Sequence, residues 1–465
     1  MSEKTLEQSL ESWRGIIEVG PQGAVIVRER NRLREEVIDS LVRLAVFSSS
    51  EGERERARVL VWEAARQTGV KPWSIQPFYD AMGRGEVKGL TTPAINLRGM
   101  VYDKARAVIR SVQRHSVGAF IFELARSEMG YTFQRCGEYA TVVIAAAVRE
   151  GFEGPLFIQG DHYQVNAKKF AQGGEARDAE IKALKDLIHE AIAAGYGNID
   201  IDASTIVDLS KGTVKEQQRD NFTISAELSA HVRSLEPKGM TISIGGEIGE
   251  VGKKNSTPEE FRVYMDGLLE VLVRLAPSAG KWKGPSKISV QTGTEHGGIP
   301  LPDGSVAKVS IDFEVLREIT RIARSEYAMA GSVQHGASTL PAEAFDRFPG
   351  SDAAEVHLAT DFQNIVYEHP AFPRELRDQM YAWLDRECAS ERKPGMTPVQ
   401  FYYKTRKKAW GPFKRQCWDL PEATRSQLRA ALEAKFDLLF GKLGVVGSVE
   451  AVRKHVKAAE FVRTL

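Results

Sequence analysis

The sequence is poor in cysteine and carries almost no net charge. Its 465 residues include three cysteines, Cys136, Cys388 and Cys417, which lie far apart and form no Cys-x-x-Cys pair. An odd number of separated cysteines argues against a disulfide framework and favours a reduced, cytoplasmic chain. A net charge of +1 gives no sign of the broad basic surface that binds nucleic acid or an anionic membrane.

Long apolar runs are absent as well. No stretch reaches the roughly 18 apolar residues that a membrane span needs, and the polar start MSEKTLEQSLESWRG lacks the apolar core of a secretory signal. We therefore expect no membrane partner and no nucleic-acid partner. The basic and aromatic stretch at residues 401–420, FYYKTRKKAWGPFKRQCWDL, could contact a nucleic acid. Packed aromatic rings and solvated charges are the more common outcome for such a segment.

Eight short apolar runs alternate with amphipathic helical segments from about residue 90 onward. The runs are LTTPAIN, GAFIFELA, PLFIQGD, NIDIDAS, MTISIGGE, KISVQTGTEH, YAMAGSVQHG and AAEVHLATD. Eight such strand-helix units in roughly 270 residues are typical of an α/β protein with a (β/α)8, or TIM barrel, fold. A doubly wound open sheet is the rival fold. It would usually show a Gly-rich phosphate turn after its first strand, and none follows LTTPAIN.

Both flanks of the barrel read as helical, because apolar residues recur at spacings of three and four. We predict a helical N-terminal extension over residues 1–85, and a linker rich in Pro and Gly over residues 69–89, where the extension meets the barrel. The barrel is predicted over residues 86–370. A helical C-terminal extension is predicted over residues 371–465.

Polar side chains gather where the predicted strands end. Asp161 and His162 end the third strand, and we expect the chain to turn there so that both side chains enter the barrel mouth. Four of the nine histidines fall on this one edge, which is where TIM barrels carry their active sites. Three imidazoles from separate strands are a usual catalytic zinc shell, although cobalt and iron also accept them. The four histidines are His162, His296, His335 and His357.

A second group of small and hydroxylated residues follows the last two strands. Gly336, Ala337 and Ser338 come directly after the seventh strand, and Thr360 follows the eighth. Barrel enzymes often bind phosphate in these two loops, where backbone N–H groups and hydroxyls surround an anion. A tight turn that needs small residues is the alternative.

These pieces, in this order, resemble the class II, metal-dependent ketose-bisphosphate aldolases that act on fructose- or tagatose-bisphosphate. The resemblance covers about residues 91–363. It rests on TTPAIN, GDH, IDIDAS, GGEIGEVG, TPEEFRVYMD, GTEHGG, VSIDFEVLREI and QHGASTLP. It implies Zn²⁺ or another divalent metal, with a monovalent cation as a further possibility, and a homo-oligomer that acts on a sugar phosphate in carbohydrate metabolism such as glycolysis.

The resemblance also implies roles for single residues. The metal ligands would be His162, His296 and His335, with Glu247 beside them as an alternative ligand or as a partner of the ligands. Asp161 would move the proton on the substrate hydroxyl while the metal stabilises an enediolate. The residues implied to bind substrate or phosphate are Asn96, Ser127, Gly297, Gly336, Ala337, Ser338, His357 and Thr360.

The chain departs from the family pattern at two places. His357 stands where the family has Asn, and the loop after GEIGEVG lacks the paired acids of the family, so the proton donor to the enediolate is unassigned and Glu250 is a poor candidate for it. Two other functions therefore stay open. One is a non-catalytic, aldolase-like barrel subunit for assembly or regulation. The other is a metal-dependent sugar isomerase or epimerase, which uses the same enediolate chemistry.

Overall fold

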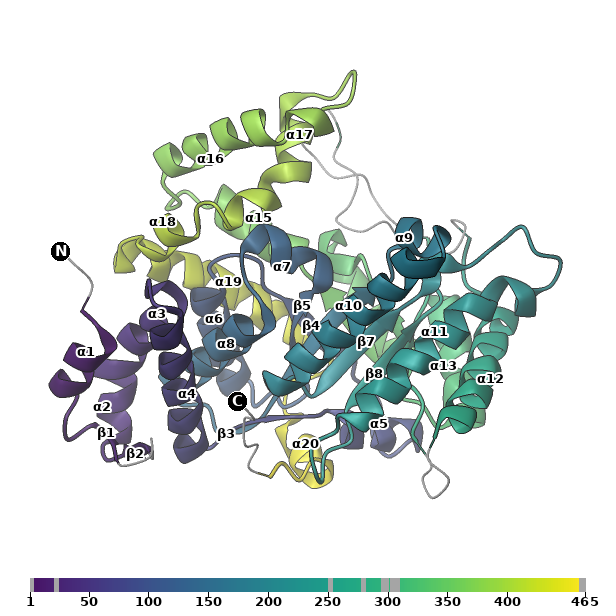
Figure 1. Cartoon of the computed structure of the whole chain (residues 1–465), viewed down its shortest axis with the longest axis horizontal. Helices are drawn as coiled ribbons and strands as arrows, with labels where there is room; N and C mark the ends of the chain where they lie inside the picture. Colours follow the sequence, from purple (N-terminus) through teal and green to yellow (C-terminus); the bar gives the residue numbers. More distant parts are fainter. Residues whose placement is uncertain are drawn as a thin grey trace.

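Eight parallel strands form a closed barrel at the centre of the molecule (Figure 1). The computed structural model describes residues 4–20, 25–249, 254–276, 282–293, 301 and 310–459. The strands pair in chain order and the last pairs with the first, which confirms the predicted TIM barrel. They are β4 (Thr92–Asn96), β5 (Ile121–Ala125), β6 (Gly154–Gln164), β7 (Asn198–Asp202), β8 (Ser243–Glu247), β9 (Lys287–Ser289), β10 (Gly331–Gln334) and β11 (Glu355–Leu358).

Helices cover the outside of the barrel, because each crossover between parallel strands needs one. Alanine, leucine and valine on their inner faces are buried against the strands. The helices and turns of the barrel are α6 (Val101–Arg114), α7 (Arg126–Thr132), α8 (Cys136–Arg149), α9 (Ala167–Ala171), α10 (Gly174–Ala193), η3 (Ser204–Ile206), α11 (Val214–Ser234), α12 (Pro258–Leu275), α13 (Phe313–Tyr327), η4 (Ala337–Thr339), η5 (Ala342–Ala344), α14 (Arg347–Gly350) and α15 (Thr360–Glu368). None of the helices in the described ranges is long and apolar enough to cross a membrane.

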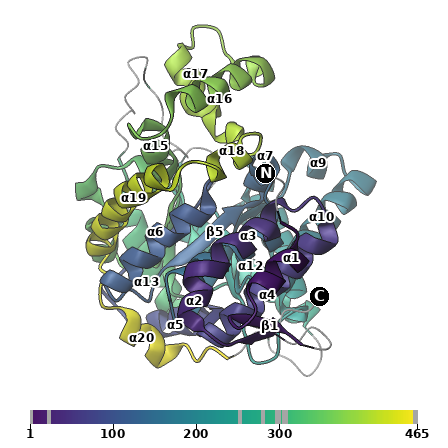
Figure 2. The ribbon, with the colours of Figure 1, turned by 90° about the vertical axis from the view of Figure 1, so that its left-hand side faces the viewer.

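The N-terminal segment packs on one side of the barrel, chiefly against α8 (Figure 2). It is not purely helical as predicted. A hairpin of β1 and β2 lies between α1 and the later helices, and β3 adds a ninth strand to the sheet beside β6. The elements are α1 (Leu6–Ser12), β1 (Ile17–Val19), β2 (Val25–Val27), α2 (Arg30–Arg32), η2 (Leu33–Val37), α3 (Ile38–Phe47), α4 (Glu51–Thr68), β3 (Val70–Trp73) and α5 (Gln76–Gly83).

The stretch that was predicted to be a linker instead closes the amino-terminal end of the barrel. β6 begins several residues before its neighbours, so its first half, from Gly154 to Phe157, would be an unpaired edge without β3. α5 lies just beyond, where Tyr79 is fully buried and donates a hydrogen bond to Glu355 inside the barrel. The Ile75 backbone N–H donates to Asn198 at 3.0 Å. Residues 70–83 therefore pack as part of the barrel.

The C-terminal segment runs from the carboxyl-terminal end of the barrel to the opposite end. α16 and α17 project from the top in Figure 1, η7 lies against α7 at the barrel mouth, and α20 returns to α5. In the basic and aromatic stretch, Phe401, Trp410 and Trp418 are buried, which supports packing over nucleic-acid stacking. The elements are α16 (Arg374–Glu387), η6 (Ala389–Glu391), α17 (Pro398–Thr405), η7 (Arg406–Trp410), α18 (Lys414–Trp418), α19 (Glu422–Lys442) and α20 (Val449–His455).

Candidate active site

A bulge in β6 places two neighbouring residues at the barrel mouth. β6 does not end at Asp161 as predicted but continues to Gln164, and its register with β7 shifts between Gly160 and Tyr163. His162 adopts a left-handed backbone conformation with φ 41°, which a non-glycine residue rarely takes. Bulges re-aim side chains beside active sites. The bulge replaces the expected turn as the reason that both Asp161 and His162 reach the site.

Asp161, His162 and His335 form what we call the rim cluster. Nε2 of His162 contacts Nδ1 of His335, and the two ring centroids lie 4.1 Å apart. Oδ1 of Asp161 lies 3.9 Å from Nε2 of His162. One ligand atom from each residue falls within 4.8 Å of the other two, which is close enough for a single metal ion. The structure therefore brings together three of the residues predicted from the sequence.

The far side of each imidazole is held by a fixed partner. Nδ1 of His162 lies 3.1 Å from Oδ2 of Asp202, and Nε2 of His335 lies 2.8 Å from the Ser289 hydroxyl. Asp202 is itself fixed, because Gln164 donates to it at 2.6 Å and Ser204 at 2.7 Å. Partners of this kind orient metal-binding histidines and set their tautomers. They aim Nε2 of His162 and Nδ1 of His335 at the same point.

Negative charge surrounds His162. Burial alone would lower its pKa, but Asp161, Asp202 and Glu247 outweigh burial and raise the pKa to about 10. The pKa of Asp202 is lowered, because its hydrogen bonds from His162, Ser204 and Gln164 overcome the effect of burial. The site thus favours positive charge at this point. A bound divalent metal supplies such charge without a proton.

Among the described residues, the ligand atoms of the rim cluster fit a divalent metal. Two imidazoles and a carboxylate converge, and both imidazoles have orienting partners. The predicted third ligand, His296, and the neighbouring Gly297 lie outside the described residues. Glu247, at the end of β8, is buried, and its Oε1 accepts a hydrogen bond from the Gly249 N–H at 2.6 Å. Its charge acts on His162, which agrees with a place beside the metal.

The loops after β10 and β11 meet as predicted. Gly336 has φ 70° and starts the short turn η4, which contains Ala337 and Ser338. The Ser338 hydroxyl accepts hydrogen bonds from the N–H groups of Ala359, at 2.6 Å, and Thr360, at 3.2 Å. It therefore caps the start of α15. The phosphate role of these residues stays a prediction.

A cavity of about 490 Å³ opens beside Asp161 and His162. Ser127 lines it, as do three cations that the sequence did not indicate, Arg98, Arg126 and Lys407. Asn96 lies nearby at the end of β4 and donates a hydrogen bond to Glu128 at 2.7 Å. Glu128 also pairs with Arg98 at 2.6 Å. Nothing in the sequence order indicated that Lys407, from the C-terminal extension, would lie at the mouth.

Below the rim lies a set of buried polar residues that the sequence analysis also missed. The interior cluster consists of Gln159, Asp200, Lys287 and Glu355, from β6, β7, β9 and β11. The Lys287 ammonium donates to Gln159 at 2.8 Å, to Asp200 at 3.0 Å and to Glu355. The available signal was a charged residue inside an apolar strand, as in KIS and AEVH.

His357 and Glu123 lie between the two clusters. The His357 ring stacks on His335 with centroids 3.9 Å apart, and its Nδ1 lies 2.9 Å from Glu123 and 3.3 Å from Asp161. Burial alone would lower the pKa of His357, but Glu123, Asp161 and Glu355 raise it well above its ordinary value. His357 therefore lies below His162 and His335, the candidate metal ligands, and inside the barrel.

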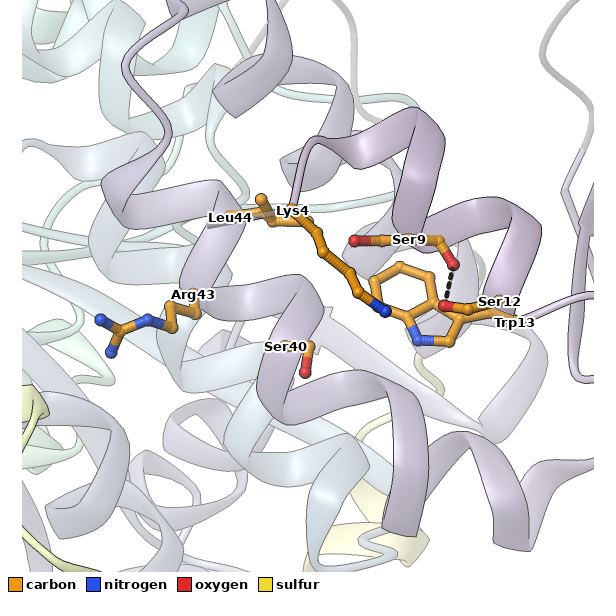
Figure 3. Close-up of a pocket in the computed structure, with 7 residues that line it drawn as sticks. All are labelled: Lys4, Ser9, Ser12, Trp13, Ser40, Arg43 and Leu44. Carbon is orange, nitrogen blue, oxygen red and sulfur yellow. Dashed lines mark hydrogen bonds between the residues drawn. The ribbon is translucent and has the colours of Figure 1, made fainter. Parts of the chain in front are cut away.

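A second pocket lies in the N-terminal segment, outside the barrel. It has a volume of about 250 Å³, and Figure 3 shows Lys4, Ser9 and Ser12 around the Trp13 indole. Arg43 points away in this view and pairs with Asp419 at 2.6 Å. The residues that line this pocket include no carboxylate and no histidine, the two kinds of group that converge at the rim, so the rim is the candidate active site.

The fold and the rim cluster define a TIM barrel whose carboxyl-terminal end carries candidate metal ligands. The family model for class-II fructose-bisphosphate aldolase matches residues 80–411. The chain belongs to this family, which confirms the resemblance seen in the sequence. A search of curated proteins gave no match.

Solved structures show the same fold at low sequence identity. One is a probable tagatose 6 phosphate kinase from Sinorhizobium meliloti 1021, with TM-score 0.54 and 15% identity over 78% of this chain and 98% of that one. Another is the fructuronate-tagaturonate epimerase UxaE from Cohnella laeviribosi, with TM-score 0.54 and 12% identity over 87% and 90%. A fructose-bisphosphate aldolase from Campylobacter jejuni has TM-score 0.46 and 17% identity over 82% and 96%. The likeness to the first two, at TM-scores above 0.5 and identities of 15% and 12%, is one of fold.

Proposed function

We propose that the protein is a metal-dependent aldolase that cleaves or forms a C–C bond in a phosphorylated ketose. The observation that carries this proposal is the convergence of Nε2 of His162 and Nδ1 of His335 beside Asp161. Class II membership supports the reaction class. The orienting partners Asp202 and Ser289 support a working site over a vestigial one, because they fix the ring nitrogens toward one point.

His162 and His335 would hold the ion, with His296 as the third imidazole. When bound, a divalent ion polarises the ketone carbonyl and stabilises the negative charge that develops on the substrate. Asp202 and Ser289 keep the two rings from rotating. Their hydrogen bonds of 3.1 Å and 2.8 Å leave one nitrogen of each ring facing the site.

Asp161 would move the proton on the substrate hydroxyl. Its side chain is mostly buried, lies 3.9 Å from Nε2 of His162 and lines the mouth cavity. A general base must reach the proton that it removes, directly or through one water. The same carboxyl group returns the proton in the direction of condensation.

The substrate would lie across the mouth with an anionic group at each side. One phosphate would bind at the loops of Gly336, Ser338 and Thr360. The opposite wall carries Arg98 and Lys407. Arg98 is already paired with Glu128, whereas Lys407 forms no ion pair within the described ranges and lies near the Tyr131 ring, 5.8 Å from its centroid. Lys407 is therefore the better candidate for a cation that pairs with substrate.

A metal-dependent epimerase or isomerase is the second candidate function. The observation that favours it is His357, which places a second acid-base group 3.3 Å from Asp161 where the family has Asn. An epimerase must remove and return a proton at carbon, and two adjacent groups of this kind suit that task.

The test is a product assay on the full chain. Protein stripped with EDTA and reloaded with Zn²⁺, Mn²⁺ or Co²⁺ is incubated with phosphorylated ketoses, and products are read by NMR. Aldolase activity gives two shorter products, epimerase activity gives a stereoisomer of the same length, and neither product in any metal-loaded sample contradicts both functions.

The Asp161→Asn variant tests the role of the base. We expect kcat to fall by roughly 10²–10⁴-fold, because general bases contribute about that much, while the rim ion stays bound. The control is Asp208→Asn, an aspartate on the surface that interacts only with its own loop. An unchanged kcat in Asp161→Asn would show that Asp161 is not the general base.

A further inference from the structure

Lys407 belongs to a turn of the C-terminal extension, η7, whose two ends are fixed to two different helices of the barrel. At the first end, the Arg406 backbone carbonyl accepts a hydrogen bond from the Tyr367 hydroxyl of α15 at 2.8 Å. Just past the last residue, the Gly411 backbone N–H donates to the carbonyl of Tyr131 on α7 at 3.0 Å. The turn is therefore held from both sides, and Lys407 lines the mouth cavity between the two anchors.

Trp410, the last residue of η7, packs directly on the loop that follows β4. The indole is 1% exposed, and its Nε1 donates to Oε1 of Gln363 on α15 at 3.0 Å. The ring lies against Gly99, where an added Cβ would overlap it. Gly99 has φ 64° and the next residue, Met100, has φ 47°, so two successive left-handed residues shape the loop. Trp410 thus packs on the backbone that carries Arg98 into the mouth cavity.

Lys104, near the start of α6, holds the same loop. Its side chain is fully buried, and its ammonium donates to the Arg98 backbone carbonyl at 2.8 Å. The ammonium also lies 5.0 Å from the centroid of the Trp410 ring, a distance at which an indole attracts a cation. Lys104 therefore links the backbone of the loop to the ring that packs on it.

The Lys104 ammonium has no carboxylate partner among the residues that the structure describes. A buried charge is costly unless it is paired, and burial, followed by the charge of Arg98, lowers the pKa of Lys104 to about 7. Lys287, inside the barrel, is by contrast paired with two carboxylates. The contacts of Lys104 offset only part of the cost of its burial, which favours a role in placing the loop over a role in stabilising the fold.

We propose that Trp410 and Lys104 are positioning residues that set the place of two cations, Arg98 and Lys407, at the barrel mouth. The C-terminal extension then builds the wall of the site that binds an anion, and does more than cover the barrel. The inference rests on the proposed function only for the identity of that anion, which is the second anionic group of the substrate. The packing contacts that carry it do not depend on the reaction.

The first test measures hydrogen exchange in the full chain. Gly99→Ala places a methyl group where the indole lies, so η7 is expected to move away from the loop. The amides of residues 406–411 should then exchange about tenfold faster, because local opening becomes easier, although they are distant in sequence. Exchange in α8 should stay as in the wild type, which shows that the barrel is folded. Unchanged exchange in residues 406–411 would overturn the proposal.

The matched control is Gly89→Ala. Gly89 has φ 75°, so it has the same left-handed backbone, but an added Cβ there meets no atom within 4 Å. Exchange in residues 406–411 should stay as in the wild type. Equally fast exchange in Gly89→Ala and Gly99→Ala would show that backbone strain, and not contact with the indole, opens the turn, and the proposal would fail.

The second test separates KM from kcat. Trp410→Leu removes the indole, and Lys104→Met removes the ammonium but keeps an unbranched side chain. Each should raise KM for a substrate with two anionic ends about tenfold and leave kcat nearly unchanged, because neither side chain lies in the rim cluster. Trp410→Phe, which keeps a ring against Gly99, should restore most of the affinity. Lys104→Met should not lower the free energy of unfolding, since it removes an unpaired buried charge.

The two tests fail in different ways. Unchanged KM in both Trp410→Leu and Lys104→Met would overturn the positioning role, whatever happens to kcat. A wild type with no activity in any metal-loaded sample would contradict the proposed function, and hydrogen exchange in Gly99→Ala would still decide whether the indole holds η7 on the loop.

Discussion

The rim cluster and the interior cluster lie in the same barrel and differ in where their charges are compensated. In the interior cluster the Lys287 ammonium lies among Asp200, Glu355 and Gln159, so the chain supplies its own cation. At the rim, ring nitrogens of His162 and His335 face each other beside Asp161, and the partners Asp202 and Ser289 hold them from behind. The interior arrangement is complete within the chain, whereas the rim arrangement is suited to receive a cation.

This difference separates polar residues that support the fold from polar residues that bind a ligand. A buried charged group is costly unless it is paired. For Lys287, hydrogen bonds to two carboxylates and an amide offset the cost of burying its charge. At the rim, by contrast, Asp202 and Ser289 orient the two imidazoles so that one nitrogen of each ring is left to bind an ion.

The largest expected effect comes from breaking the rim. His335→Ala should abolish binding of the rim ion and lower kcat/KM by about 10²–10³-fold, the range seen when a group that stabilises developing charge is removed. Ser289→Ala, which removes only the orienting hydrogen bond, should lower metal affinity by about 10–100-fold. Metal titrations and steady-state kinetics measure both. Equal effects in the two variants would show that Ser289 does more than orient the ring.

The interior cluster should respond in stability. Lys287→Met removes the ammonium that pairs with the buried carboxylates of Asp200 and Glu355 and leaves them only His357, and we expect the free energy of unfolding to fall by about 3–5 kcal/mol. The control is Lys283→Met, because Lys283 pairs with Asp80 at the surface, where a pair contributes about 0–1 kcal/mol. Urea unfolding measures both variants. A small loss for Lys287→Met would mean that the interior charges are relieved in another way.

Lys407 sharpens the comparison at the mouth, because it forms no ion pair with any residue that the structure describes. Lys407→Met should raise KM for a substrate with two anionic ends about tenfold, equal to about 1.4 kcal/mol, and should leave kcat nearly unchanged. Lys404→Met on the exposed face of α17 is the control. A substrate with one anionic end shows which wall of the mouth binds that end. If it binds near Ser338, Lys407→Met should leave KM for this substrate unchanged.

The smallest expected effect is on pH dependence. Burial and the charge of Arg98 lower the pKa of Lys407. The ammonium therefore loses its proton at a lower pH than an ordinary lysine, and KM should rise as pH increases through that pKa. An anion that pairs with the ammonium raises the pKa, so binding there takes up a proton. KM profiles of wild type and Lys407→Met should converge at high pH, and parallel profiles would assign the dependence to another group.

The repeating pattern of the sequence was enough to predict the barrel and much of the rim. Apolar runs bounded by helices predicted all eight strands, and Asp161, His162 and His335 were predicted because they follow strands whose carboxyl ends meet. Belonging to an aldolase family was predictable from the ordered motifs. His296 and Gly297, which the same motifs indicated, lie outside the described residues.

The remaining features depend on contacts between distant segments. The bulge at His162 is a local change of register that no residue pattern announces. β3 and α5 are short and contain Pro and Gly, and they are ordered because they cover the free half of β6. Glu123, Lys287 and Lys407 come from three separate parts of the chain, so only the fold shows where in the barrel each one lies.

The most direct test of the account is anomalous X-ray diffraction from crystals of the full chain grown with Zn²⁺, recorded on both sides of the zinc absorption edge. The account predicts an anomalous peak between Nε2 of His162 and Nδ1 of His335 that is lost in His335→Ala. A zinc-loaded wild-type crystal with no peak at this point would contradict the claim that the rim cluster is a metal centre.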